Sequence, residues 1–322
     1  MKEQQSTATD GRVERLSATL RLTPGPDGRY TGPWHDAVVA SGDTVMRWRT
    51  VLIGPHADPV WRCGTGDTVL FSHEGTAHVL LQHGNARVAH AAHAVLGKDL
   101  AAGQVPQYTV PAGSHYALVP PDSGHVLLSE AHVPGEAECE TTPFPRPRLS
   151  TAPSPVGVPS DRSSTRTAHL LDLAAHVEGG YFRQMYESTA TVATERGIRT
   201  LANTIYYLLD RASPVGHLHG NVSDITHFLH RGGPVHYLLL SPDGELHERV
   251  LGLDVERGEV PAFTCPGAWW KTSFLPDGVT EGLISEIVAP GFDFADQRMA
   301  RAQDIAAAFP EHARRLERYV SH

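Results

Sequence analysis

Short apolar runs separated by turn residues are the main pattern along this chain. The runs are rich in β-branched and aromatic residues, and glycine, proline or aspartate turns separate them. Many short strands with regular turn signals predict an all-β sandwich or barrel. Such runs occupy residues 68–73, 77–83, 108–113 and 125–132 in the first half, and 204–210, 225–230, 235–244 and 282–288 in the second.

One stretch near the C-terminus departs from this pattern. Residues 294–320 space Met299, Ile305 and Leu316 among charged residues. This spacing predicts an amphipathic helix that is broken near Pro310, because a proline inside a helix removes a backbone hydrogen bond and clashes with the preceding turn.

The two halves of the chain resemble each other. Four islands of similar sequence recur in the same order, with loops of different length between them, which indicates a tandem duplication. Residues 25–30 match 176–181, residues 66–75 match 223–232, residues 96–113 match 251–268, and residues 129–135 match 285–291.

Composition along the chain predicts its domain boundaries. Residues 1–17 are polar and predict a disordered tail. Residues 136–167 are rich in Pro, Ser and Thr without any strand or helix period, which predicts a linker. The expected domains are therefore residues 18–135 and residues 168–322, the second of which includes the C-terminal helix.

The overall composition excludes several classes of protein. The chain has 322 residues, a formal net charge of -9 and no basic block, which argues against a nucleic-acid partner. No apolar run approaches the ~20 residues of a membrane span, and the start lacks a secretory signal. Cys63, Cys139 and Cys265 form no CxxC pair and are expected to be reduced thiols in a cytoplasmic monomer or homodimer.

Spaced histidines in the second half resemble a known motif. His217 and His219 are followed by Asp224 and later by Gly232, as in the first motif of the cupin superfamily. Residues 266–271 resemble its second motif in weakened form. The resemblance implies two tandem double-stranded β-helix barrels joined by the linker, with the repeat extending the fold to the first half.

More narrowly, the second half is similar to the cupin-5 subfamily, a domain of unknown function. The similarity is carried by residues 177–183, 223–228, 289–296 and 309–312. It implies a fold and says little about a reaction, because one fold hosts many activities.

The histidine pair is a candidate metal site. On a strand, His217 and His219 at positions i and i+2 lie on one face, and Asp224 would complete a set of two histidines and one carboxylate. Such a set holds a divalent metal ion such as Fe, Mn, Ni or Zn. His227 is an alternative third ligand, because one alignment with the subfamily matches Asp224 and His227 to a Glu and His pair.

Lys271 stands where many cupins supply a further histidine. A charged lysine does not ligate a metal, but it would donate a proton, pair with a substrate carboxylate, or act as a base if burial lowers its pKa. The candidate catalytic residues are Lys271, His227, Tyr206 and Tyr181, and the candidate substrate-binding residues are Glu178, Arg183 and Trp270.

Plain structural interpretations exist for the same residues. In a chain with 20 histidines the pair at 217 and 219 is also explained as ordinary strand residues. A capped turn and a surface pair explain Glu178, Tyr181 and Arg183, and core packing explains Trp270 and Tyr206. Glu286, which matches Glu130 of the first half, is expected to serve the fold.

The first half has lost the metal set. Val60, Arg62 and Tyr116 stand at the positions of His217, His219 and Lys271, and Arg62 would repel a divalent cation. A structural role is therefore expected for this half, such as replacing the partner subunit of a cupin dimer.

These features together predict a metal-dependent enzyme, with its active site in the second barrel. The metal would polarise a small oxygen-bearing metabolite, and a nearby side chain would move a proton, as in an isomerase, epimerase or cyclase of secondary metabolism. Two alternatives are an Fe(II)-dependent dioxygenase with the same ligands and a non-catalytic bicupin that binds small molecules.

Overall fold

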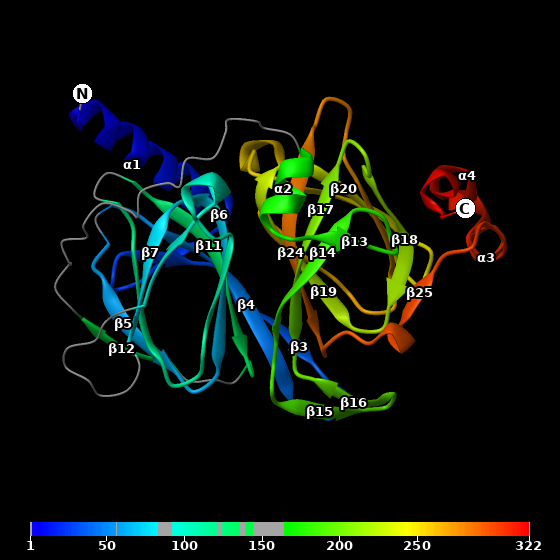
Figure 1. Cartoon of the computed structure of the whole chain (residues 1–322), viewed down its shortest axis with the longest axis horizontal. Coiled ribbons are helices and arrows are strands. Elements are labelled where there is room, and N and C mark those ends of the chain that lie inside the picture. The colour runs from blue at the N-terminus through cyan, green and yellow to red at the C-terminus, as the bar shows by residue number, and fades with distance from the viewer. Residues whose placement is uncertain are drawn as a thin grey trace. The chain divides into compact units, whose positions relative to one another are not determined.

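The computed structural model divides the chain into two compact units, Met1–Ser160 and Asp161–His322, each built around a β-barrel (Figure 1). It describes residues 2–55, 57–82, 92–121, 124–135, 139–143 and 164–321. The division between the units falls inside the segment expected to be a linker.

The N-terminal barrel consists of two antiparallel sheets. Its apolar core includes Val51, Leu70, Tyr116 and Leu128, which alternate with residues on the outer faces of the strands. One sheet has the order β1 (Thr23–Pro24), β2 (Arg29–Thr31), β4 (Thr44–Ile53), β11 (Val126–Val133), β6 (Asp67–Gly75) and β9 (Gln107–Val110), with β3 (His35–Val38) beside β4. The other has the order β12 (Cys139–Pro143), β5 (Val60–Gly64), β10 (His115–Val119), β7 (Ala77–Gln82) and β8 (Ala92–Leu96).

The C-terminal barrel repeats this order of strands. A short hairpin of β15 (Thr191–Thr194) and β16 (Gly197–Thr200) is added to it. The first sheet has the order β13 (Ala174–Ala175), β14 (Tyr181–Glu187), β17 (Asn203–Asp210), β24 (Glu281–Ala289), β19 (Asp224–Gly232) and β22 (Ala262–Cys265). The second has the order β21 (Leu246–Leu251), β20 (Val235–Leu240), β23 (Trp270–Phe274), β18 (Val215–Asn221) and β25 (Gln297–Met299).

The strand orders confirm the fold class predicted from the sequence. The run β4-β11-β6-β9 of the first unit corresponds to β17-β24-β19-β22 of the second, and β5-β10-β7-β8 corresponds to β18-β23-β20-β21. Each unit is thus a double-stranded β-helix barrel, and positions in one barrel have equivalents in the other.

The N-terminal segment differs from expectation. Residues predicted to be a disordered tail form most of helix α1 (Lys2–Thr19). Val13 and Leu16, one helical turn apart, are buried, and Arg12 forms an ion pair of 2.7 Å with Glu74 of β6. Two buried apolar residues and one ion pair thus hold a mostly polar helix against the barrel. Because the segment has few apolar residues, its sequence predicted disorder instead of a helix.

The predicted linker is also structured at both of its ends. Strand β12 pairs with β5 over Cys139–Pro143, and helix α2 (Ser164–Leu170) begins before residue 168. Residues 136–138 and 144–163 of that prediction lie outside the described residues.

The C-terminal segment confirms the helix broken at Pro310. Helix α3 (Ala302–Ala308) ends just before α4 (Pro310–Leu316), and Pro310 occupies the first turn of α4, where its missing N–H costs nothing. Ile305 and Leu316 pack with Tyr319 on the outer face of the second sheet. Met299, by contrast, lies in β25. No helix in the described part of the chain is long and apolar enough to cross a membrane.

Candidate functional site

Five ionisable side chains gather inside the C-terminal barrel and are here named the lumen cluster. Alternation along the strands brings them there beside the core residues Tyr207, Leu229 and Tyr237. All five residues are buried. The lumen cluster consists of Glu178, His219, His227, Lys271 and Glu286.

A glycine turn delivers Glu178 to the lumen. Gly179 and Gly180 follow it with φ values of 91° and 69°, a region that side chains rarely adopt. A Cβ on Gly179 would lie 2.2 Å from the carbonyl oxygen of Val215. The sequence EGGY at 178–181 therefore specifies a tight turn against β18, with the glutamate directed inward.

Lys271, Glu286 and His227 form a closed triangle of polar atoms. Lys271 Nζ lies 3.3 Å from Glu286 Oε1 and 3.4 Å from His227 Nε2, and His227 Nδ1 lies 3.0 Å from Glu286 Oε1. The ammonium can only donate, so His227 Nε2 accepts from it and Nδ1 carries the proton toward Glu286. The three side chains are at most 10% exposed.

Burial and charge fix the protonation states in this triangle. Burial lowers the pKa of His227 to about 4, and the nearby ammonium of Lys271 acts in the same direction. Burial alone would raise the pKa of Glu286, but Lys271 and then His227 hold it well below its usual range. Glu286 is therefore a carboxylate and His227 a neutral imidazole near neutral pH.

Glu178 is in the opposite state. Burial raises its pKa to about 8, so that it is mainly a neutral carboxylic acid at pH 7. Its Oε1 accepts a hydrogen bond from the side-chain amide of Gln297 and lies 3.2 Å from His219 Nε2. Burial, and after it the charge of Lys271, lowers the pKa of His219 to about 3. His219 Nδ1 donates to the carbonyl oxygen of His217 at 2.7 Å, which leaves Nε2 as a lone pair directed at Glu178.

A cavity of about 110 Å³ opens beside the two glutamates. This volume is well below the roughly 300–1,000 Å³ of pockets for drug-sized ligands, and it suits a small metabolite. Its lining combines apolar and amide side chains with the carboxyl groups of Glu178 and Glu286 and the imidazole of His176, whose Nδ1 lies 3.7 Å from Glu178 Oε2. It also includes Gln184, Asn203, Asn221, Ile225, Val288 and Phe292.

The three expected metal ligands do not converge. His219 lies in the lumen, but β18 has a bulge between Gly216 and His219 that breaks the simple alternation of the strand. His217 Nδ1 lies 3.3 Å from the carbonyl oxygen of Tyr319, in the segment that follows α4. In the ranges that the structure covers, no three His, Cys, Asp or Glu side chains lie close enough together to hold a metal ion. The residues present therefore do not fit the predicted metal.

Asp224 has a structural role that its counterpart in the other barrel shares. Its Oδ1 accepts a hydrogen bond of 2.7 Å from the backbone N–H of Gly267. In the N-terminal barrel, Asp67 Oδ1 accepts one of 2.9 Å from the N–H of Ala112. Since a barrel without the histidine pair keeps this bond, the aspartate holds a turn in both barrels, and this contact explains Asp224 without a metal.

Three predicted site residues of the first sheet point away from the lumen. Phe182 and Tyr207 face the interior, so their neighbours Tyr181, Arg183 and Tyr206 lie on the outer face. Arg183 Nη1 donates to the carbonyl oxygen of Leu171 at the surface. The structure therefore places Tyr181, Tyr206 and Arg183 outside this lumen, and it does not bring them together with the lumen cluster as the sequence predicted.

Trp270 is also displaced by one position. It precedes Lys271 on β23 and therefore lies on the opposite face, in the apolar cluster beneath the C-terminal helices. The guanidinium of Arg298 stacks over its ring at 4.1 Å. Trp270 thus packs the outer face of the sheet and does not reach the cavity.

Glu286, Gln297 and Tyr207 are the lumen residues that the sequence interpretation missed. Glu286 was assigned to the fold, yet it ion-pairs with Lys271 and lines the cavity. Its recurrence as Glu130 in the first half was the available signal. Tyr207 donates a hydrogen bond of 2.8 Å to the carbonyl oxygen of Gly179 and so braces the turn that carries Glu178.

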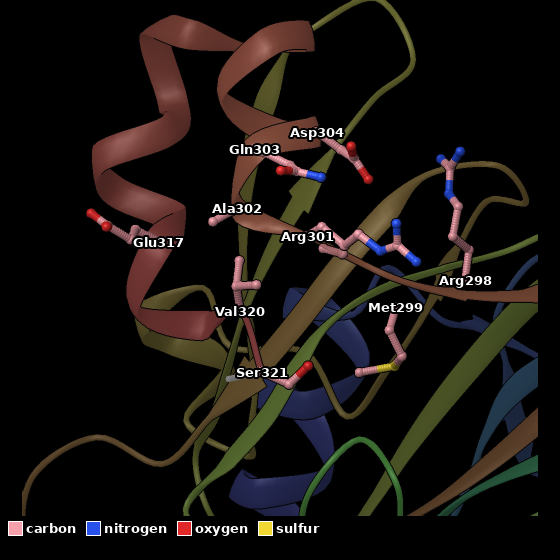
Figure 2. Close-up of a pocket in the computed structure, with 10 residues that line it drawn as sticks. Arg298, Met299, Arg301, Ala302, Gln303, Asp304, Glu317, Val320 and Ser321 are labelled. Carbon is pink, nitrogen blue, oxygen red and sulfur yellow. The ribbon is translucent and has the colours of Figure 1, made fainter.

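A larger hollow of about 1040 Å³ lies outside the barrel, between β25 and the C-terminal helices (Figure 2). Figure 2 shows Arg298, Arg301, Asp304 and Glu317 around it. None of the predicted site residues lines this hollow, and the candidate site remains the lumen cluster with its cavity.

Two tandem double-stranded β-helix barrels with polar residues gathered inside the barrel define a protein of the cupin superfamily. Within it, residues 165–300 match the family described as Cupin superfamily (DUF985), Cupin_5. An uncharacterized protein of Saccharomyces cerevisiae is 38% identical over 146 residues, which are 41% of this chain and 72% of the yeast protein. The chain therefore belongs to the Cupin_5 family.

Solved structures are also similar to this chain. A hypothetical protein from Leishmania major is 29% identical, with a TM-score of 0.48, over 50% of this chain and 100% of the other. Oxalate decarboxylase from Bacillus subtilis is 10% identical, with a TM-score of 0.47, over 92% of this chain and 82% of the other.

Proposed function

We propose that the C-terminal barrel moves a proton on a small, uncharged hydroxy-carbonyl metabolite, as an isomerase or epimerase does. The observation that carries this proposal is a single cavity lined by two carboxyl groups in opposite protonation states. Neighbouring carboxyl groups whose pKa values are driven apart are typical of acid–base catalysis.

Glu178 is the proton-carrying group in this proposal. Its pKa of about 8 lies close to neutral pH, where a side chain both accepts and returns a proton efficiently. In its ionised form it takes the proton from the carbon beside the substrate carbonyl, and the electron pair of that C–H bond moves into an enolate. Glu178, whose carboxyl proton exchanges with solvent, then delivers a proton to the original carbon on its other face, or to the former carbonyl carbon while the hydroxyl proton moves to the former carbonyl oxygen. The reaction therefore needs no oxidant or other co-reactant.

Lys271 is a positioning residue here. It keeps Glu286 ionised, and Glu286 in turn presents a fixed acceptor to a substrate hydroxyl in the cavity. The amide groups of Asn203 and Asn221 supply N–H donors that would stabilise charge on the carbonyl oxygen.

The charge of the lumen cluster favours an uncharged substrate. One ammonium balances one carboxylate, while Glu178 and both histidines are mainly neutral near pH 7. An anionic substrate would meet Glu286 without a surplus cation in the cluster to offset it.

The metal-dependent forms of the expected function, Lewis-acid proton transfer and Fe(II) oxygen chemistry, both need ligands that converge. The described ligand set does not meet that requirement. The proposal therefore keeps the proton transfer and assigns no step to a metal.

Deuterium exchange tests this proposal directly. The protein is incubated in D2O with dihydroxyacetone, glyceraldehyde and related small hydroxy-carbonyl compounds, and deuterium at the carbon beside the carbonyl is followed by NMR. We expect the wild type to accelerate exchange for at least one compound and Glu178→Gln to lose at least about 100-fold of that rate, as for loss of a general base.

Tyr206→Phe is the matched control, because Tyr206 lies on the outer face of the sheet and is expected to leave the rate unchanged. If no compound exchanges above the buffer rate although one of them binds, the barrel is a binding module and the catalytic proposal is wrong.

A further inference from the structure

The N-terminal barrel contains a group of five charged residues, named here the arginine cluster, three of which stand at positions equivalent to members of the lumen cluster. The pair Arg62 and Tyr116 of β5 and β10 corresponds to the pair His219 and Lys271. Glu130 lies opposite Leu70, as Glu286 lies opposite His227. The arginine cluster consists of Asp27, Arg29, Arg49, Arg62 and Glu130.

Two of the arginines have carboxylate partners. Arg49 Nε donates to Glu130 Oε1 at 2.8 Å, and its Nη2 lies 2.6 Å from the same oxygen. Arg62 Nη2 donates to Asp27 Oδ2 at 2.9 Å. These contacts occupy one oxygen of Glu130 and one oxygen of Asp27.

Arg29 is the exception. It is 4% exposed, and its Nη2 lies 3.5 Å from Glu130 Oε2 in a long ion pair. Neither its Nε nor its Nη2 has a hydrogen-bond acceptor in the structure, and Glu130 Oε2 has no donor. Arg29 Nη2 thus faces Glu130 Oε2 only at ion-pair distance, and Nε has no acceptor among the described residues. Because buried N–H groups of a guanidinium are almost always satisfied, this edge of Arg29 suits an added acceptor such as a ligand oxygen.

The charges around Arg29 leave a surplus of one cation. Arg29, Arg49 and Arg62 act together on Glu130, and the carboxylates facing them are Glu130 and Asp27. The neighbouring His132 adds no charge near neutral pH, because burial lowers its pKa. The three arginines therefore exceed the two carboxylates by one positive charge, which a ligand with a single negative charge would neutralise.

The cluster also reaches solvent. The side chains of Arg49, Arg62 and Asp27 are 19%, 13% and 17% exposed, whereas Arg29 is almost fully buried, so the cluster has a solvent-facing side and Arg29 lies deeper. A ligand that enters past them meets the fork of Nε and Nη2, which matches the two oxygens of a carboxylate.

We propose that the N-terminal barrel binds a small monocarboxylate at Arg29. This assigns a ligand site to the half that was expected to be structural only. The site is independent of the proton-transfer site in the other barrel, and its ligand differs in charge.

Thermal unfolding at constant ionic strength tests the proposal, with acetate, pyruvate and benzoate as probes and sulfate as the dianion. We expect at least one monocarboxylate to raise Tm in a saturable way. Arg29→Met should abolish that rise, and Arg29→Lys, which keeps the charge but not the fork, should weaken the apparent Kd by about tenfold, as expected for loss of a bidentate pair.

Arg183→Gln, at the surface of the other barrel, is the control and should keep the full response to carboxylate. The proposal is overturned if no monocarboxylate at up to ~50 mM shifts Tm, since binding that weak adds little stability. It is equally overturned if the shift survives in Arg29→Met and Arg29→Lys, or if sulfate shifts Tm through Arg29 more strongly than the carboxylates do.

Discussion

Glu130 of the N-terminal barrel and Glu286 of the C-terminal barrel occupy the same position on the central strand of their sheets. Glu130 is held by the guanidinium of Arg49, with Arg29 nearby, whereas Glu286 is held by the ammonium of Lys271. The duplicated fold thus keeps a buried carboxylate and changes the cation around it. In the N-terminal barrel the three arginines exceed the carboxylates that face them by one positive charge. In the C-terminal barrel the charge of Lys271 is balanced by that of Glu286.

Because the two barrels share one fold, a comparison between them separates features of the fold from features of one barrel. A feature found in both, such as the aspartate that holds a turn at Asp67 and at Asp224, belongs to the fold. A feature found in one only, such as the raised pKa of Glu178 or the unsatisfied guanidinium of Arg29, belongs to that barrel's own chemistry.

The largest expected difference between the barrels is in the cost of removing the cation. Lys271→Met leaves Glu286 buried without its ammonium, and we expect a loss of about 3–5 kcal/mol in the free energy of unfolding, as for other broken buried ion pairs. Arg29→Met should cost far less, because Glu130 keeps Arg49. Urea unfolding of both variants measures this.

The double variant Lys271→Met with Glu286→Gln should recover much of that loss, because no unpaired charge remains. Equal costs for Lys271→Met and Arg29→Met would mean that the two cations are equivalent.

The second difference is in the dependence of stability on pH. The pKa of Glu178 is raised in the folded state to about 8, so the folded protein holds a proton that the unfolded chain releases above about pH 4.5. Stability from this group is therefore complete below pH 4.5 and is lost as the pH rises toward 8, by up to about 1.4 kcal/mol per pH unit.

The free energy of unfolding is measured against pH for the wild type and for Glu178→Gln. The difference between the two curves gives the contribution of Glu178 without that of the histidines.

Glu74 of the N-terminal barrel should contribute a slope of the opposite sign. Its pKa is lowered to about 2, because hydrogen bonds from His125 and Arg12 outweigh the effect of burial, so Glu74→Gln removes stability that disappears as the pH falls from about 4.5 to 2. Slopes of the same sign would contradict the assignment.

A smaller effect, equal in both barrels, is expected for the two turn aspartates. Asp67→Ala and Asp224→Ala each leave a backbone N–H without its acceptor, at a cost of about 1–3 kcal/mol. Chemical denaturation measures both. A much larger cost at Asp224 would show that this residue does more than hold the turn.

The smallest expected effect is that of removing metal. Exhaustive chelation should shift Tm by less than about 1 °C and leave any exchange activity unchanged, because the described ligands do not converge. A loss of activity that one equivalent of a divalent ion restores, and that His219→Ala abolishes, would revive the metal-dependent hypothesis.

The sequence predicted the fold because its signals are local. Turn residues bound each strand, Pro310 breaks the C-terminal helix, and the repeated islands mark equivalent strands. Helix α1 escaped prediction because, among its described side chains, Val13 and Leu16 are the buried apolar ones, and two such residues do not form a recognisable helical period.

The candidate site was predicted less well than the fold. Side chains alternate between the two faces of a strand, so an error of one residue in the sequence alignment moves a predicted site residue to the wrong face. Tyr206 and Trp270 each lie one residue from a lumen residue, Tyr207 and Lys271, and therefore face the opposite way. The bulge in β18 displaces His217 for the same reason. Long-range pairs such as Lys271 with Glu286 leave no trace in local pattern.

The position of His217 links the lumen to the outside of the barrel. Its backbone N–H donates to the carbonyl oxygen of Glu178, while its ring meets the carbonyl oxygen of Tyr319, which packs with the C-terminal helices. One residue thus joins the turn that carries Glu178 to the segment that follows α4. The C-terminal helices are therefore part of the support of the lumen wall as well as the cover of the outer face of the sheet.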